Sequence, residues 1–138
     1  MLLSKADITN YLPHRAPFLM VDNLLTASPE QFETDFFIPA ENPLVQGGIF
    51  QESGLIENIA QTCAVAFGYL DSGEGPAKMG FIGAISKLEV FTLPPAGSTI
   101  RTIVTPQHQL GNIYLVKGES YLEGRILLGC EMKIVVAE

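Results

Sequence analysis

An almost apolar segment of the chain, from Gly54 to Leu70, has the residue spacing of an α-helix. Its apolar side chains fall on two neighbouring stripes: Leu55, Ile59, Cys63 and Phe67 on one, and Ile56, Ala60 and Ala64 on the next. The polar exceptions gather on one narrow face near its start: Glu57, Asn58, Gln61 and Thr62. A helix with so little polar surface must be surrounded by protein on most sides. We therefore expect a central helix that ends at Gly68 or at the DSGEG loop beginning with Asp71.

Four segments after this helix alternate between apolar and polar positions, as β-strands do: 79–91, 98–109, 113–122 and 125–137. The last alternates most clearly, with these apolar side chains on one face: Ile126, Leu128, Cys130, Met132, Ile134 and Val136. The sequences LPPAG, LGN and EG separate the four segments. Connections this short predict antiparallel hairpins.

The start of the chain is expected to be less regular. Ser4 and Asp7 fit a capping box, in which both side chains satisfy the first amides of a short helix. That helix must end before Pro13, and the two prolines of LPHRAPF hold residues 12–18 extended.

Two further strands are expected over 20–27 and 31–38, joined by a turn at Ser28-Pro29, before a long loop over 39–48 that leads into the helix. This order of elements predicts an α+β fold in which an antiparallel sheet wraps around one long central helix. Residues 1–138 are expected to form a single domain. The sheet would cover one side of the helix and a second copy of the protein the other.

The composition narrows the classes of protein that fit. A hydrophobic content of 47% in 138 residues allows a real core. The net charge of -7 weighs against binding to nucleic acid, because phosphate contacts need clustered Lys and Arg. No apolar run is long enough to span a membrane. The start of the chain lacks the layout of a secretory signal, so we expect a cytoplasmic protein.

The cysteines do not indicate a metal or a disulfide framework. Cys63 and Cys130 each fall among apolar positions and are interpreted as core residues. The sequence contains no Cys-x-x-Cys or His-x-x-x-His spacing of the kind that binds zinc. We expect no metal site and no cofactor.

Glu57 is the candidate catalytic residue, because an ionised carboxylate on an enclosed helix is costly unless a partner or a reaction uses it. The alternative is that it belongs to an exposed polar stripe with its polar neighbours on the helix. Gln61 lies one turn further on and either orients the carboxylate or pairs with the backbone.

Histidine, the usual partner in proton transfer, occurs only at His14 and His108, and neither lies just upstream of Glu57. We expect His14 and Arg15 to hold a loop by hydrogen bonds and His108 to lie on the surface.

Three motifs of the chain occur in the order found in one known family. LPHRAPFLMVD, over 12–22, resembles the N-terminal signature of that family, and ENIAQ, over 57–61, resembles its Glu-x-x-Ala-Gln helix. FIGAI, over 81–85, followed by Phe91 and PPAG over 94–97, is similar to its strand and Pro-Gly turn. The family is the hot-dog-fold β-hydroxyacyl-acyl carrier protein dehydratases. The resemblance implies a hot-dog fold, a dimer with its active site at the subunit interface, and a substrate carried as a thioester on acyl carrier protein.

The resemblance fails at one position that matters for the chemistry. The family's catalytic histidine lies in a Gly-His-Phe-Pro stretch shortly before the helix, whereas the corresponding AENPLVQGGIF, over 40–50, contains no histidine. Counting back from Glu57 reaches Asn42 to Gln46. The Gly47-Gly48 pair resembles a divergent branch, associated with aryl-polyene-type pigments, in which two unlike hot-dog subunits can work together.

Dehydration of a 3-hydroxyacyl thioester needs a base for the proton next to the carbonyl, an acid for the leaving hydroxyl and amides for the enolate-like oxygen. Glu57 can be the acid. Asn42 and Gln46 can form hydrogen bonds but cannot accept a proton, and Gly47 and Gly48 would let the backbone approach the thioester. We predict Glu57 as catalytic and these residues as substrate-binding: Asn42, Gln46, Gly47, Gly48, Gln61, Phe81 and Gly83.

The sequence leaves two alternatives for the identity of the base: Glu57 could serve as both base and acid, or a partner subunit could supply a histidine. We therefore predict a 3-hydroxyacyl-acyl carrier protein dehydratase-like protein of fatty acid or polyene-type acyl chain biosynthesis. It would work as a homodimer or in a hetero-oligomer with a second hot-dog subunit. In the hetero-oligomer it could be the non-catalytic half. The rival hypotheses are a module that binds an acyl thioester or lipid without catalysis, and a hot-dog thioesterase. LPHRAPF favours the dehydratase over the thioesterase.

Overall fold

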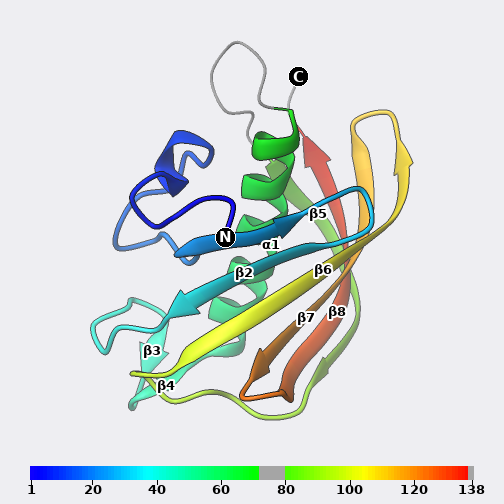
Figure 1. Ribbon diagram of the computed structural model, residues 1–138. Coiled ribbons are helices and arrows are strands. Elements are labelled where there is room, and N and C mark those ends of the chain that lie inside the picture. The colour runs from blue at the N-terminus through cyan, green and yellow to red at the C-terminus, as the bar shows by residue number, and fades with distance from the viewer. Residues whose placement is uncertain (72–79, 137–138) are drawn as a thin grey trace.

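One long helix, α1 (Glu52–Leu70), lies against a curved antiparallel sheet in the computed structural model, which describes residues 1–71 and 80–136 (Figure 1). This arrangement confirms the predicted α+β architecture, with a sheet that curls around a single central helix. The helix ends at Leu70, so the second of its two expected ends is correct. No helix among these described residues is long and apolar enough to cross a membrane.

Each strand of the main sheet is antiparallel to its neighbours. From one edge to the other the strands are β1 (Asn23–Ala27), β2 (Phe32–Phe37), β6 (Thr99–Leu110), β7 (Ile113–Leu122), β8 (Arg125–Val136) and β5 (Gly80–Val90). The hairpins β6–β7 and β7–β8 are confirmed. The hairpin expected at LPPAG is wrong. This connection joins β5 to β6, but β2 and β7 already occupy both sides of β6, and β5 pairs with β8.

The first strand begins later than residue 20, because the backbone of Met20 is bonded to side chains of the helix. The N–H of Met20 donates to Gln61 Oε1 at 2.7 Å, and Asn58 Nδ2 donates to the carbonyl oxygen of Met20 at 2.7 Å. The strand β1 begins at Asn23, and the N–H of Asp22 just before it already donates to the carbonyl oxygen of Asp35 on β2 at 2.9 Å. The N-terminal segment therefore lies along α1, as the blue trace in Figure 1 shows.

The capping box expected at the start of the chain is wrong. Ser4 Oγ donates to Asp7 Oδ2 at 3.2 Å, so the two side chains bond to each other and not to the backbone amides of a helix. Only a short 3-10 helix, η1 (Ile8–Asn10), follows, and the side chain of its N-cap residue, Asp7, accepts no hydrogen bond from the backbone amides of the helix.

The segment 39–48, expected to be a loop, contains one strand of a small hairpin, β3 (Val45–Gln46), which pairs with β4 (Ile49–Phe50). Gly47 and Gly48 form its turn with φ of +60° and +77°, a conformation that glycine adopts without strain. Strands of two residues are too short to show any alternation, which is why the pattern gave no signal for them.

The polar face of α1 is buried, and it ties the helix to the sheet. Asn58, Gln61 and Thr62 are all fully buried. Thr62 Oγ1 lies 2.7 Å from Thr34 Oγ1 of β2, and Asn58 Oδ1 accepts a hydrogen bond from Thr102 Oγ1 of β6. The alternative of an exposed polar stripe is therefore wrong for these side chains, which are satisfied inside the core.

The two apolar stripes of α1 differ in burial. Leu55, Ile59 and Cys63 of the first are fully buried. Ile56, Ala60 and Ala64, the whole of the second, are only half-buried. A single chain therefore leaves one apolar side of its central helix partly uncovered.

Both cysteines are free and buried. Burial raises the pKa of the Cys130 thiol to about 11 and that of the Cys63 thiol further still. Their predicted role as core residues is confirmed.

Candidate active site

Glu57 lies in the second turn of α1 and presents its carboxylate at the edge of the core. Its side chain is 36% exposed. Gln61 Nε2, one helical turn further on, donates a hydrogen bond to Glu57 Oε1 at 3.0 Å. The carboxylate is thus held by a buried neighbour while part of it remains accessible.

Gln61 is fixed by three hydrogen bonds, so it cannot turn away from Glu57. Its Oε1 accepts the N–H of Met20 at 2.7 Å, and its Nε2 also donates to the carbonyl oxygen of Phe18 at 2.9 Å. Because an N–H must meet an oxygen, the Met20 bond fixes which end of the amide is NH₂, and that end faces Glu57. Gln61 therefore both orients the carboxylate and pairs with the backbone, which combines the two alternatives expected for it.

His14 lies opposite Glu57, although the sequence offered no reason to place them together. His14 Nε2 is 3.5 Å from Glu57 Oε1, and the imidazole side chain is 32% exposed. The other ring nitrogen, Nδ1, is buried and has no hydrogen-bond partner among residues 1–71 and 80–136. Burial of Nδ1 leaves Nε2 as the nitrogen that faces the carboxylate and the accessible side.

The loop-holding role expected for this pair falls to Arg15. Its guanidinium donates from Nη1 to the carbonyl oxygens of Leu12 at 2.7 Å and of His14 at 2.8 Å. These bonds fix the backbone that carries the imidazole. The signal that could have identified His14 was its place within the LPHRAPFLMVD motif, next to the residues that contact the helix.

An open cavity of about 170 Å³ lies beside the imidazole and is lined by Pro13, His14, Ala64 and Gly80. It joins the N-terminal segment, the half-buried stripe of α1 and the start of β5. His14 is the residue that both lines this cavity and faces Glu57.

Two of the predicted substrate-binding residues, Phe81 and Gly83, lie on β5, the strand whose first residue lines this cavity. Phe81 directly follows the cavity-lining Gly80 and is largely exposed. A Cβ added at Gly83 would lie 3.3 Å from Val135 Cγ2 of β8, so the absence of a side chain serves close packing there. Whether either residue contacts a substrate stays a prediction.

Besides Gln61, four more predicted substrate-binding residues lie on the chain before α1, in and next to the β3–β4 hairpin. Asn42 is buried and its Oδ1 accepts the N–H of Leu44 at 2.9 Å, which is a bond within the loop. Gln46, Gly47 and Gly48 are exposed. Within the described ranges, no hydrogen bond or ion pair joins any of the four to the Glu57 carboxylate. Their role in binding stays a prediction.

Asp22 is a second partly enclosed carboxyl near this region, but it has a structural role. Burial raises its pKa, against the lowering effect of a hydrogen bond that its Oδ2 accepts from the N–H of Phe37 at 2.7 Å. Lys5 Nζ lies 3.8 Å from its Oδ1. These contacts tie the N-terminal segment to β2. The described part of the chain contains no group of three His, Cys, Asp or Glu side chains placed to hold a metal.

The arrangement brings a carboxyl group and an imidazole from separate elements face to face, with His14 Nε2 3.5 Å from Glu57 Oε1. Carboxylate and imidazole are the two groups most used for proton transfer, and both are partly accessible here. An accessible pair of this kind can remove a proton from one atom of a bound molecule and deliver a proton to another.

Curated dehydratases match the chain along most of its length. The 3-hydroxyacyl-[acyl-carrier-protein] dehydratase FabZ of Clostridium kluyveri is 30% identical over 122 residues, which cover 84% of this chain and 83% of the relative. The FabZ of Latilactobacillus sakei is 25% identical over 145 residues, covering 98% and 99%.

Among solved structures, the dehydratase heterocomplex ApeI:P from Xenorhabdus doucetiae superposes with a TM-score of 0.86 over 95% of this chain and 91% of that one. The two are 17% identical, so the likeness shows the fold, and it confirms the predicted hot-dog fold.

A family model described as ApeP dehydratase matches residues 6–135. The match runs through the N-terminal segment, the helix and all six strands of the main sheet. The predicted membership in the hot-dog dehydratases, and in their divergent branch, is thereby confirmed: this chain belongs to the ApeP-like dehydratase family.

Proposed function

We propose that this protein dehydrates 3-hydroxyacyl thioesters carried on acyl carrier protein, as a subunit of an assembly of hot-dog subunits. Its family is named for a dehydratase, and the names of its curated relatives specify a 3-hydroxyacyl-[acyl-carrier-protein] substrate. A dehydratase needs an accessible and oriented general acid, since the leaving hydroxyl must take a proton as it departs as water, and a carboxyl group is one of the groups that can supply it.

The observation that carries the proposal is the hydrogen bond by which Gln61 orients the Glu57 carboxylate. A solvated glutamate on a helix surface samples many rotamers, whereas this one is bonded at 3.0 Å to an amide that is itself bonded twice to the N-terminal segment. Positioning of a reacting group to within a fraction of an ångström is what proton transfer to a bound substrate requires.

The direct test is incubation of the purified protein with a 3-hydroxyacyl-acyl carrier protein, followed by mass spectrometry of the carrier. We expect the carrier-bound chain to lose one water. The assay is run with the chain alone and with a second hot-dog subunit, because the heterocomplex form is part of the proposal. Release of free carrier thiol would indicate a thioesterase, and tight binding without any change in mass would indicate a binding module; either result would contradict the proposal.

The surface for a second subunit is the edge of the sheet at β5. All eleven residues of β5 are exposed in the single chain, and its side away from β8 pairs with no strand in the described ranges. Its exposed large apolar side chains are Phe81, Ile82, Ile85, Leu88 and Val90. A long edge strand with apolar side chains is a template for pairing with another strand. The half-buried stripe of α1 gives a second reason to expect a covering subunit.

Introduction of a lysine in place of an apolar side chain on this strand should break the assembly. In Ile85→Lys a charge replaces an apolar side chain in the interface, and we expect the variant to sediment as a monomer under conditions in which the parent protein assembles. The measurement is sedimentation velocity of the chain alone and mixed with a second hot-dog subunit.

Leu110→Lys is the matched control, because Leu110 is 71% exposed at the turn between β6 and β7, away from β5. It should assemble as the parent does. Assembly of Ile85→Lys to the same extent as the control would show that β5 is not the interface.

A further inference from the structure

We propose that His14 is the base of this site and that it forms, with Glu57 of the same chain, the proton-transfer pair that the segment before α1 lacks. The inference rests on the proposed dehydratase function and deepens it. Residues 40–50, where a catalytic histidine was expected, contain none. In the structure a histidine of the N-terminal segment, His14, lies next to Glu57 instead.

The geometry suits two groups that act on different atoms of one substrate. The 3.5 Å between His14 Nε2 and Glu57 Oε1 is longer than an ordinary hydrogen bond between these groups. Such contacts are often long in the absence of substrate and shorten in the complex. At this separation each group can contact its own atom of a bound chain, and a proton can still pass between them.

The cavity supplies the second, independent observation. The imidazole forms part of the wall of the cavity of about 170 Å³, together with Pro13, Ala64 and Gly80. Apart from the imidazole, the described residues of this wall are small or rigid and have no ionisable side chains. A thioester chain lying in the cavity would therefore contact the imidazole, and Glu57 Oε1 lies 3.5 Å from its Nε2.

A purely structural role for the imidazole finds little support. The loop backbone is already held by the Arg15 guanidinium, through the carbonyls of Leu12 and His14. The ring itself has a buried Nδ1 without a partner in the described parts of the chain, and its other nitrogen faces only Glu57. A histidine kept for stability would be expected to use both nitrogens.

The reaction balances with these two groups alone. His14 Nε2 takes the proton from the carbon next to the thioester carbonyl, and the electron pair of that C–H bond forms the new C=C bond. The C–O bond of the 3-hydroxyl breaks as the hydroxyl takes a proton from the Glu57 carboxyl, and water leaves. The imidazolium then passes its proton to the Glu57 carboxylate, which restores both groups for the next turnover.

The test is the variant His14→Gln in the assembled protein, assayed with a 3-hydroxyacyl-acyl carrier protein over a range of pH. Glutamine can form hydrogen bonds but cannot take a proton. We expect kcat to fall by about 10²–10⁴-fold with KM little changed, the range typical for loss of a general base. The acid limb of the pH profile of kcat/KM, which reports protonation of the base, should disappear with it.

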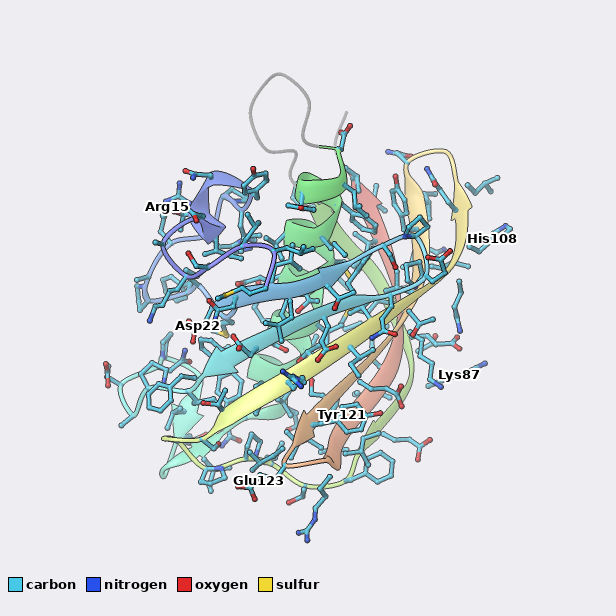
Figure 2. All side chains as sticks on the ribbon, viewed as in Figure 1. Arg15, Asp22, Lys87, His108, Tyr121 and Glu123 are labelled. Atoms are coloured by element: carbon cyan, nitrogen blue, oxygen red, sulfur yellow. The ribbon has the colours of Figure 1, made fainter. Side chains whose placement is uncertain are left out.

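The matched control is His108→Gln, because this other histidine of the chain is exposed on the far end of β6. Figure 2 shows His108 at the opposite side of the molecule from Arg15, the neighbour of His14. The control should keep the parent's kcat. A further variant, His14→Ala, should regain part of its turnover when free imidazole is added, which a merely structural role would not give.

The outcomes separate the two proposals. An active parent with an equally active His14→Gln would overturn the role of His14 and leave the dehydratase function standing. Loss of turnover in His14→Ala without any response to imidazole, with the thermal unfolding curve unchanged, would also overturn it. An unsubstituted assembly that forms no enoyl product would contradict the proposed function, and the role of His14 with it.

Discussion

Glu57→Gln is expected to lower the turnover of 3-hydroxyacyl-acyl carrier protein by about 10²–10⁴-fold, the contribution typical of a positioned acid or base. The amide keeps the size of the side chain and its hydrogen bond from Gln61, but it has no proton of useful acidity to give to the leaving hydroxyl. The stability of the fold should hardly change, because the side chain is partly exposed. The measurement is kcat by loss of water from the carrier-bound chain, with thermal unfolding as a check on the fold.

Glu52→Gln is the matched control, since Glu52 is an exposed carboxylate in the first turn of the same helix. It should keep full turnover. If His14 and Glu57 act as a unit, the double variant His14→Gln/Glu57→Gln should lose no more than the worse single variant. Full turnover by Glu57→Gln would remove this carboxylate from the mechanism.

Asn58→Ala is expected to destabilise the fold by about 3 kcal/mol, because it removes a hydrogen-bond partner from each of two buried groups. The carbonyl oxygen of Met20 loses its donor, and the hydroxyl of Thr102 loses its acceptor on the helix, keeping only Ser120 Oγ at 3.2 Å. The side chain is fully buried, so truncation also leaves a small void. Urea unfolding of the parent and the variant measures the difference.

The control for this change is Asn10→Ala, at an exposed asparagine in η1, which should alter the free energy of unfolding by no more than about 0.5 kcal/mol. Equal stability of the two variants would mean that the buried polar contacts of α1 contribute little. Because Asn58 and Gln61 both bind the backbone of Met20, a destabilised Asn58→Ala protein should also be a poorer enzyme.

The long helix α1 and the strands β6, β7 and β8 could be predicted from periodicity, because each presents one apolar face to the same core. The alternation in β8 and the stripes of α1 are repeated often enough to outweigh local exceptions. The β3–β4 hairpin and the late start of β1 could not be predicted. The hairpin is too short to show a period. The late start of β1 depends on hydrogen bonds between helix side chains and the backbone of Met20.

The candidate site was predictable in part for the same reason. Glu57 stands out because it is charged in an apolar segment, and Gln61 because it lies one turn away. The neighbourhood of His14 and Glu57 is a tertiary contact between distant segments, which local sequence cannot show. The burial of Asn58 and Thr62 could not be predicted for the same reason, since β2 and β6, which are distant in sequence, supply hydrogen-bond partners for their side chains.

The uncovered edge at β5 has a consequence for how such a protein must be made in a cell. Copies produced in excess of the subunit that covers this edge would offer one another an apolar strand, which is the starting point for ordered aggregates. Solubility would then depend on stoichiometry, and matched synthesis of the covering subunit would protect the newly made chain as well as complete it.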